Sequence, residues 1–159
     1  MRFLHDLALG ERFACGSFTL SRAEIIDFAG RYDPQPFHLD DAAAAVSYFG
    51  SLCASGLHTQ AAAIGLLVPV IADVSVVAGY RLHEARFFIP VRPELTYDVA
   101  AVWTAITPAP LHPERGRADI TVDVTNAETR QVATVGVTYV VRERPGRSRN
   151  ERPVAPWGG

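Results

Sequence analysis

The chain has 159 residues, enough for one folded domain with a substantial core. Hydrophobic residues make up 48% of it and charged residues 20%, which excludes a mainly disordered or fibrous protein. The 15 cationic residues stand against 17 acidic ones, and the net charge of -2 makes a nucleic-acid partner unexpected. All 15 cations are Arg, which excludes chemistry that needs a Schiff-base lysine or a P-loop lysine.

The cysteines and the apolar stretches indicate the compartment. Cys15 and Cys53 are the two cysteines, and no Cys or His cluster has the spacing of a zinc site, so we expect no metal and a reducing, cytoplasmic setting. The most apolar stretch, residues 61–72, is too short to span a bilayer. Asp6 and Glu11 interrupt the N-terminal region before an apolar run reaches signal-peptide length. The sequence therefore predicts a soluble protein without a membrane partner.

The first half of the chain predicts helices. Ser21 and Glu24 have the spacing of a capping box, which predicts a helix over residues 22–30. Two prolines within residues 33–38 cannot continue that helix, so this segment is expected to be an ordered, extended loop. The alanine run at 42–45 then predicts a short helix.

The longest predicted helix runs from Gly56 to Ala72. Ser55 is its expected N-cap, and Pro69 is expected to kink or break it late. Nearly every residue in this stretch is apolar. A helix that is apolar on all sides is expected to be wrapped by other structure.

The second half of the chain predicts β-strands, and one more strand is expected around residues 12–20. Residues 119–124 alternate Asp or Thr with Ile or Val, which is typical of a half-buried strand. Residues 126–130 are expected to form a turn, and residues 107–116, with three prolines, a surface loop. Runs rich in Val, Thr, Tyr and Phe place the strands at 80–89, 95–106, 118–124 and 132–141.

Together these elements predict an α+β fold. A single domain over residues 1–141 is expected, in which an antiparallel sheet curls around one long central helix. A second copy placed beside the first would extend the sheet and protect an edge, so the minimal expectation is a homodimer. Residues 142–159 hold five Arg, three Pro and three Gly, which predicts a disordered tail.

Asp33 and His38 are the candidate acid/base pair. On an α-helix, side chains five positions apart diverge by about 140° and cannot serve one substrate. A loop stiffened by prolines can instead aim both groups at one point, with little entropy cost for holding them there. The alternative is that Asp33 caps a turn and His38 is an ordinary histidine on the surface or at a helix start.

The start of the long helix is the second candidate region. A helix N-terminus offers free amide hydrogens and the positive end of a dipole, and Gly56 allows close approach to the backbone. A thioester carbonyl placed there would have its developing enolate stabilised. The alternative is that Ser55 simply caps a core helix.

Three segments resemble the MaoC-like dehydratase family, whose members include (R)-specific enoyl-CoA hydratases: YDPQPFHLD at 32–40, ASGLHT at 54–59 and FIPVRP at 88–93. The similarity covers most of residues 12–141. It implies a hotdog fold, in which an antiparallel sheet wraps a long central helix. It also implies a dimer with the acyl thioester at or near the subunit interface.

The resemblance implies roles for particular residues. Asp33 and His38 would hold one water and add it to a trans-2-enoyl thioester on one face, or catalyse the reverse dehydration; one group takes a proton from water and the other delivers a proton to the α-carbon. The amide of Gly56 would be the oxyanion donor, with Ser55 and Leu57 beside it in the substrate-binding region. Coenzyme A or an acyl carrier would enter as part of the substrate, without a separate cofactor.

Some positions and alternatives stand apart from this pattern. His58 is a candidate for the acyl pocket, and a helix histidine satisfied by hydrogen bonds is an equal alternative. Gln35 stands where the family more often has Asn, and Glu94 begins the segment where the family usually has a Gly-Asp turn. The alternative functions are a hotdog thioesterase and a non-catalytic subunit that binds acyl thioesters.

Overall fold

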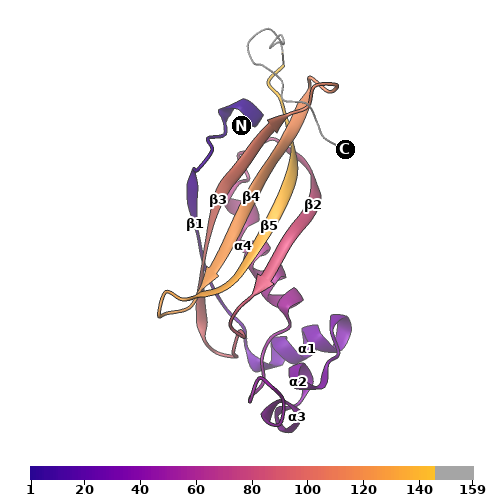
Figure 1. Ribbon diagram of the computed structural model, residues 1–159, viewed down its shortest axis with the longest axis vertical. Helices are drawn as coiled ribbons and strands as arrows, with labels where there is room; N and C mark the ends of the chain where they lie inside the picture. Colours follow the sequence, from indigo (N-terminus) through magenta and orange to yellow (C-terminus); the bar gives the residue numbers. More distant parts are fainter. Residues whose placement is uncertain (146–159) are drawn as a thin grey trace.

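A computed structural model describes residues 1–145 of the chain. The helical segments gather at the two ends and along one side of a single sheet (Figure 1). In chain order the elements are η1 (Leu4–Asp6), β1 (Arg12–Thr19), α1 (Arg22–Tyr32), α2 (Pro36–Leu39), α3 (Asp41–Ala45), α4 (Gly56–Val70), β2 (Val76–Phe87), β3 (Thr96–Pro108), β4 (Arg115–Thr125) and β5 (Gln131–Arg142).

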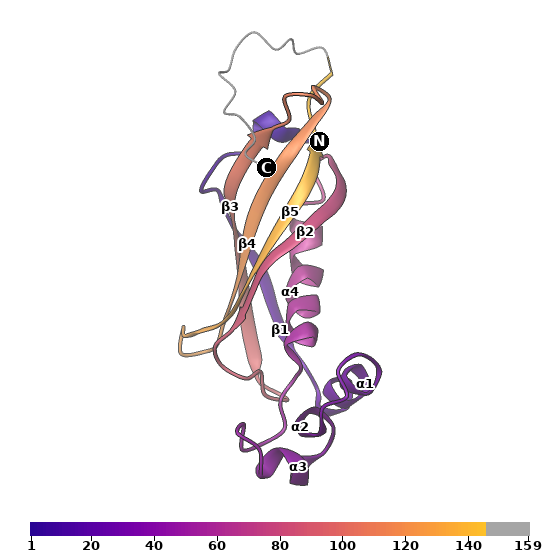
Figure 2. The same cartoon turned by 45° about the vertical axis from the view of Figure 1, so that its right-hand side comes forward.

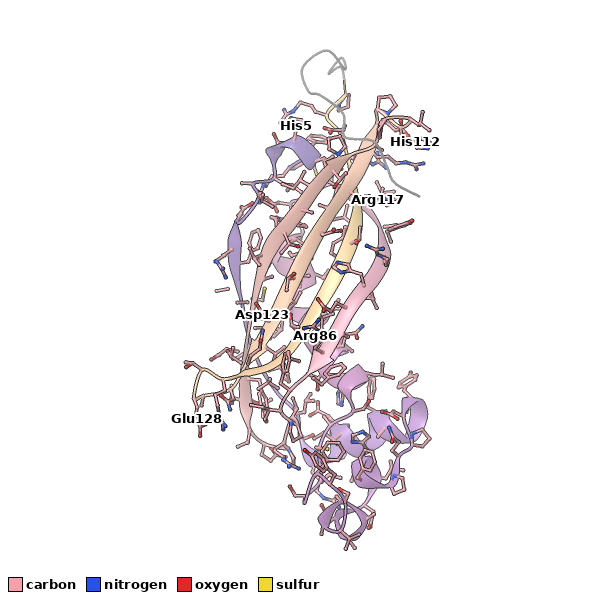
Figure 3. The ribbon with its side chains drawn as sticks, viewed as in Figure 1. His5, Arg86, His112, Arg117, Asp123 and Glu128 are labelled. Carbon is pink, nitrogen blue, oxygen red and sulfur yellow. The ribbon has the colours of Figure 1, made fainter. Side chains whose placement is uncertain are left out.

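The sheet has five strands in the order β1-β3-β4-β5-β2, and every neighbouring pair is antiparallel. The alternation expected in β4 is present: Ile120, Val122 and Val124 are fully buried. Arg117 and Asp123 of the same strand lie on the opposite face of the sheet (Figure 3). The predicted strands are therefore confirmed, and one face of the sheet is apolar.

Helix α4 runs along this apolar face (Figure 2). Thr59, Ala63 and Leu67 are the buried residues of the helix, whereas Leu57 and Val68 on its other side are 52% and 51% exposed. The sequence predicts cover on all sides of this helix, but the described residues of one chain cover only part of it. The remaining apolar surface of α4 is open in the single chain.

The segment expected to be an extended loop contains one turn of helix. Pro36 is the first residue of α2, and Gln35 is its N-cap. The prediction is wrong for residues 36–39 because a proline at the first helical position loses no hydrogen bond and already has a helical φ. Helix α3 follows, with the side chain of Asp40 accepting a hydrogen bond from the amide of Ala43.

The end of the sheet away from α1 holds both ends of the described chain (Figure 1). The β3–β4 loop is shorter than expected, because the two strands extend to Pro108 and from Arg115. Strand β5 includes Arg142, and Glu143 Oε2 lies 2.9 Å from Nδ1 of His5. The ordered chain thus continues past the predicted start of the tail, whose remaining residues, 146–159, lie outside the described residues.

No helix within residues 1–145 combines the length and the apolar character that a membrane-spanning helix needs.

Candidate active site

The carboxylate of Asp33 is held where α1 ends. Its Oδ2 accepts a hydrogen bond from the hydroxyl of Ser55 at 2.6 Å, and its Oδ1 accepts one from the side-chain amide of Gln35 at 3.0 Å. The hydrogen bond from Ser55 is the largest cause that lowers the pKa of Asp33 below its ordinary value, and the bond from Gln35 is the next. Burial acts in the opposite direction and raises the pKa, whereas the nearby His38 lowers it further. Asp33 is therefore an ionised carboxylate at neutral pH.

The imidazole of His38 is buried in α2 and fixed in one orientation. Its Nδ1 lies 2.7 Å from the carbonyl oxygen of Cys53. Because a carbonyl only accepts, Nδ1 carries the hydrogen and donates it, so a lone pair is on Nε2 whenever the ring is neutral. The rings of Phe37 and Phe49 flank the imidazole, with centroids 4.5 Å and 6.5 Å away. Nε2 is the atom of His38 left available for chemistry.

The two groups face each other across a short gap. Nε2 of His38 is 3.6 Å from Oδ2 of Asp33. That separation is too long for a direct hydrogen bond, but one water at about 2.8 Å from each atom fits beside the pair. Both atoms accept hydrogen bonds, so such a water would donate one hydrogen to each of them.

Ser55 connects this pair to the start of α4. As the N-cap, its hydroxyl oxygen accepts a hydrogen bond from the amide of Leu57 at 3.1 Å while its proton is donated to Asp33. The amide of Gly56, the first residue of the helix, has no hydrogen-bond partner within residues 1–145. A free amide at the positive end of a helix can donate to a carbonyl oxygen or an oxyanion.

The space beside the backbone of Gly56 is taken by a neighbouring ring, which would have to move to admit a side chain there. A Cβ at this position would lie 2.8 Å from Cε2 and 2.9 Å from Cζ of Phe87, closer than real Cβ contacts. The sequence interpretation assigned the glycine to close approach by a substrate. In the structure the side of the glycine where a Cβ would point is occupied by Phe87, which closes one wall of the site.

These groups line a cavity of about 860 Å³. Of the predicted site residues, Asp33, His38, Ser55, Gly56 and Leu57 are all on its wall. His58 is not among the described residues that line it. Its ring stacks on Phe28 of α1 with the centroids 4.3 Å apart, and burial lowers the pKa of His58. The structure thus brings five of the six predicted residues together.

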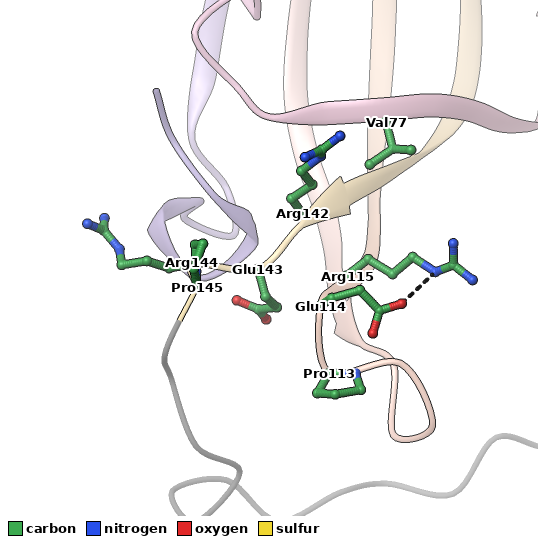
Figure 4. A pocket seen from close by; sticks show the side chains of 8 residues that line it. All are labelled: Val77, Pro113, Glu114, Arg115, Arg142, Glu143, Arg144 and Pro145. Carbon is green, nitrogen blue, oxygen red and sulfur yellow. Dashed lines mark ion pairs between the residues drawn. The ribbon is translucent and has the colours of Figure 1, made fainter.

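A second cavity, of about 500 Å³, lies at the opposite end of the sheet (Figure 4). Its charged residues are largely paired with one another or with neighbours. Glu114 lies 3.6 Å from Arg115, and Arg144 pairs with Asp6 at 3.0 Å. Neither Asp33 nor His38 lines this cavity, so it is separate from the candidate active site.

Comparison with known proteins gives the family. A family model described as the MaoC-like domain matches residues 8–132, most of the chain. The chain belongs to the MaoC-like dehydratase family.

Solved structures and a curated relative agree with this assignment. A MaoC-like dehydratase from Rhodospirillum rubrum is 37% identical, with a TM-score of 0.80 over 91% of this chain and 99% of that one. An (R)-hydratase from A. caviae involved in PHA biosynthesis has the same fold at 22% identity, with a TM-score of 0.66 over 84% of this chain and 96% of that one. The uncharacterized protein YdeM of Bacillus subtilis (strain 168) is 30% identical over 57% of this chain and 65% of its own length. The predicted hotdog fold is confirmed.

Several contacts of this MaoC-like site were not found from the sequence. The carbonyl of Cys53 orients His38, and Phe87 closes the wall at Gly56. The guanidinium of Arg92 donates to the carbonyls of Phe49, Ser51 and Leu52 and so fixes the segment before α4. A backbone carbonyl leaves no signal in the sequence. Phe87 precedes the FIPVRP segment and Arg92 lies within it, so the resemblance of this segment to the family was a signal that could have identified both as site residues.

Proposed function

We propose that this MaoC-like protein adds water to a trans-2-enoyl thioester, or removes it from the corresponding 3-hydroxyacyl thioester. The observation that carries the proposal is the pair formed by Oδ2 of Asp33 and Nε2 of His38, 3.6 Å apart on the wall of the cavity. Two acceptors at this separation suit the binding and activation of a single water.

In the proposed hydration, the water oxygen forms a bond to the β-carbon while a proton passes from the water to one member of the pair. The carbon–carbon double bond opens, and its electrons move to the α-carbon and the carbonyl oxygen. The amide of Gly56 donates to that oxygen as negative charge develops on it. The proton is then delivered to the α-carbon, and dehydration is the same sequence in reverse.

Which of Asp33 and His38 moves the proton is open to measurement. Since Asp33 is ionised and His38 has its Nδ1 hydrogen committed to a carbonyl, neither brings a spare proton when the ring is neutral. The proton that reaches the α-carbon would then be the one taken from the water. The other group orients the water by accepting its second hydrogen.

The proposed substrate is a thioester of coenzyme A or of an acyl carrier, which enters as part of the substrate without a separate cofactor. The cavity wall near His38 is aromatic, with Phe37 and Phe49 among its residues. The guanidinium of Arg92 is already engaged by three backbone carbonyls. This wall suits an apolar acyl group better than one with a second carboxylate.

We also propose that the protein acts in the cytoplasm as a homodimer formed through β2. This strand is at the edge of the sheet, and all of its residues after Val76 are exposed. Its exposed apolar side chains include Val77, Tyr80 and Leu82. An unpaired edge with such side chains is normally covered, and pairing with a second β2 would cover it. Light scattering should give twice the chain mass of 17.3 kDa; the chain mass itself would contradict the dimer.

The test of the function is mass-spectrometric. The protein is incubated with a series of trans-2-enoyl-CoA thioesters, and the products are examined for the addition of one water. A water adduct that disappears in Asp33→Asn and in His38→Ala is the expected result. Release of free coenzyme A would instead identify a thioesterase. Tight binding without turnover of any thioester would identify a non-catalytic binding subunit.

A further inference from the structure

The ring of Phe87 stands beside the amide that is proposed to hold the substrate carbonyl. Phe87 is the last residue of β2 and pairs with Ala133, a buried residue of β5, so its side chain points to the sheet face on which α4 lies. The three atoms nearest to the missing Cβ of Gly56 all belong to this ring, at 2.8, 2.9 and 3.0 Å. The ring thus lies against the first turn of α4.

The position of the ring limits the space around a bound carbonyl. By standard backbone geometry, a Cβ position lies about 2.5 Å from the amide nitrogen of the same residue, so the ring edge is at most about 5 Å from the nitrogen of Gly56. A carbonyl oxygen that accepts from this amide lies about 2.9 Å from the nitrogen. The α-carbon is two bonds from that oxygen, so a substrate whose α-carbon is turned toward β2 brings a substituent on it against the ring.

We propose that Phe87 is a specificity-determining residue, which restricts the substrate to thioesters that carry no branch on the α-carbon. This inference rests on the proposed function, because it needs the carbonyl to be bound at Gly56. With the α-carbon turned toward β2, a methyl group on it would meet the ring edge of Phe87. An unbranched 2-enoyl thioester leaves that space to the ring.

Phe87 suits this role because it can be changed without disturbing the core. Its side chain is 48% exposed, and it lies at the end of an edge strand. Phe88 is the matched control: it also lines the cavity, is 52% exposed, and contributes none of the three atoms nearest to the missing Cβ. Phe87→Ala and Phe88→Ala would both enlarge the cavity, whereas only Phe87→Ala would free space next to the α-carbon of the substrate.

The experiment measures kcat/KM for trans-2-butenoyl-CoA and for trans-2-methyl-2-butenoyl-CoA. One extra methyl group in a closed pocket changes selectivity by about 10- to 200-fold, so the wild type should prefer the unbranched substrate by a factor in this range. Phe87→Ala should reduce the preference at least about tenfold. Phe88→Ala should leave it unchanged. Melting temperatures of both variants check that they fold.

A binding measurement separates this inference from the proposed function. Calorimetry with butanoyl-CoA and 2-methylpropanoyl-CoA reports the same discrimination without any reaction. An absence of turnover in the wild type would overturn the hydratase function. If the wild type still binds butanoyl-CoA more tightly than 2-methylpropanoyl-CoA, and only Phe87→Ala removes this difference, the role of Phe87 is supported. A preference unchanged by Phe87→Ala, or changed equally by Phe88→Ala, would overturn the role of Phe87 alone.

Discussion

Two histidines, His5 in η1 and His38 in α2, show what distinguishes the site from an ordinary cluster of charges. The N-terminal end of the chain, which holds η1, and α2 lie at opposite ends of the molecule (Figure 1). Nδ1 of His5 lies 2.9 Å from Glu143, and its Nε2 lies 3.3 Å from Asp6, so carboxylates engage both nitrogens. His38 has a backbone carbonyl on Nδ1, and its Nε2 faces Asp33 across a gap that a water can enter. His5 joins the two ends of the described chain, whereas His38 keeps one atom open to a cavity.

The same difference holds for the surroundings of the two histidines. Near His5, the cavity at the end of the sheet has charged groups that neutralise each other, as Glu114 and Arg115 do (Figure 4). Near His38, the carboxylate of Asp33 is held by the neutral donors Ser55 and Gln35, with no arginine paired to it in the described residues. An active site is thus recognised by the atoms that remain unengaged, not by the number of charges.

The largest expected effect separates the two histidines directly. His38→Gln should lower kcat/KM for hydration by about 10²- to 10⁴-fold, the usual contribution of a general acid or base. His5→Gln should leave it within twofold of the wild type, since His5 does not line the site cavity. Steady-state kinetics of both variants on one thioester is the measurement. Equal losses in the two variants would contradict the distinction.

A smaller effect is expected from Ser55→Ala, which removes a helix cap together with one donor to Asp33. Ser21→Ala is the matched control, because Ser21 caps α1 without touching the site. Each variant should lose about 1 kcal/mol of stability. Ser55→Ala alone should also lower kcat/KM, by about ten- to a hundredfold if the donated bond to the carboxylate is worth about 1.5–3 kcal/mol.

The pH profile of Ser55→Ala gives a second, independent readout. The hydrogen bond from Ser55 is the largest cause that lowers the pKa of Asp33, so activity that needs the carboxylate is lost as the pH falls through that lowered pKa. Removing the bond raises the pKa toward its ordinary value. The acid limb of kcat/KM should therefore move to higher pH in Ser55→Ala and stay in place in Ser21→Ala. A stationary limb in both variants would show that Asp33 does not control it.

Gln35→Leu should give a weaker form of the same change. Gln35 is exposed and donates the longer of the two bonds to Asp33, so its loss should lower kcat/KM by less than about tenfold and raise the acid limb slightly. Gln35→Asn tests whether a shorter amide, which the family more often has here, can make the bond. A larger fall in kcat/KM from Gln35→Leu than from Ser55→Ala would show that the hydrogen bond from Gln35 to Asp33 matters more than the one from Ser55.

The smallest expected effect concerns the end that holds His5. Glu143→Gln removes the charge of the carboxylate beside Nδ1 and should lower the melting temperature by a few degrees at most, because partly exposed ion pairs contribute little. Activity should not change. A large loss of activity would show that this end of the sheet takes part in the reaction.

Most elements of the fold, and the proximity of Asp33 and His38, could be predicted from the sequence for physical reasons. Alternation predicted a strand at residues 119–124, the capping box of Ser21 predicted α1, and the apolar run after Ser55 predicted α4. The resemblance of residues 32–40 to the family motif predicted that Asp33 and His38 act together, and their side chains lie 3.6 Å apart. The single turn of helix α2 was missed because two prolines usually exclude a helix, although one of them suits its first position.

The contacts that tune the site could not be predicted in this way. Ser55 reaches Asp33, and Cys53 reaches His38, only after α1, α2 and α4 have packed together. Those contacts depend on tertiary structure, and one of them uses a carbonyl that every residue possesses. The ring of Phe87 meets Gly56 for the same reason, because Gly56 begins α4 and Phe87 ends β2, and only the fold brings these two ends together.

The hydroxyl of Ser55 gives the site a property that its separate parts do not have. Asp33 ends one helix and Gly56 begins another, yet one side chain is hydrogen-bonded to the first and caps the second. The carboxylate proposed to handle the proton and the amide proposed to bind the carbonyl therefore share one anchor.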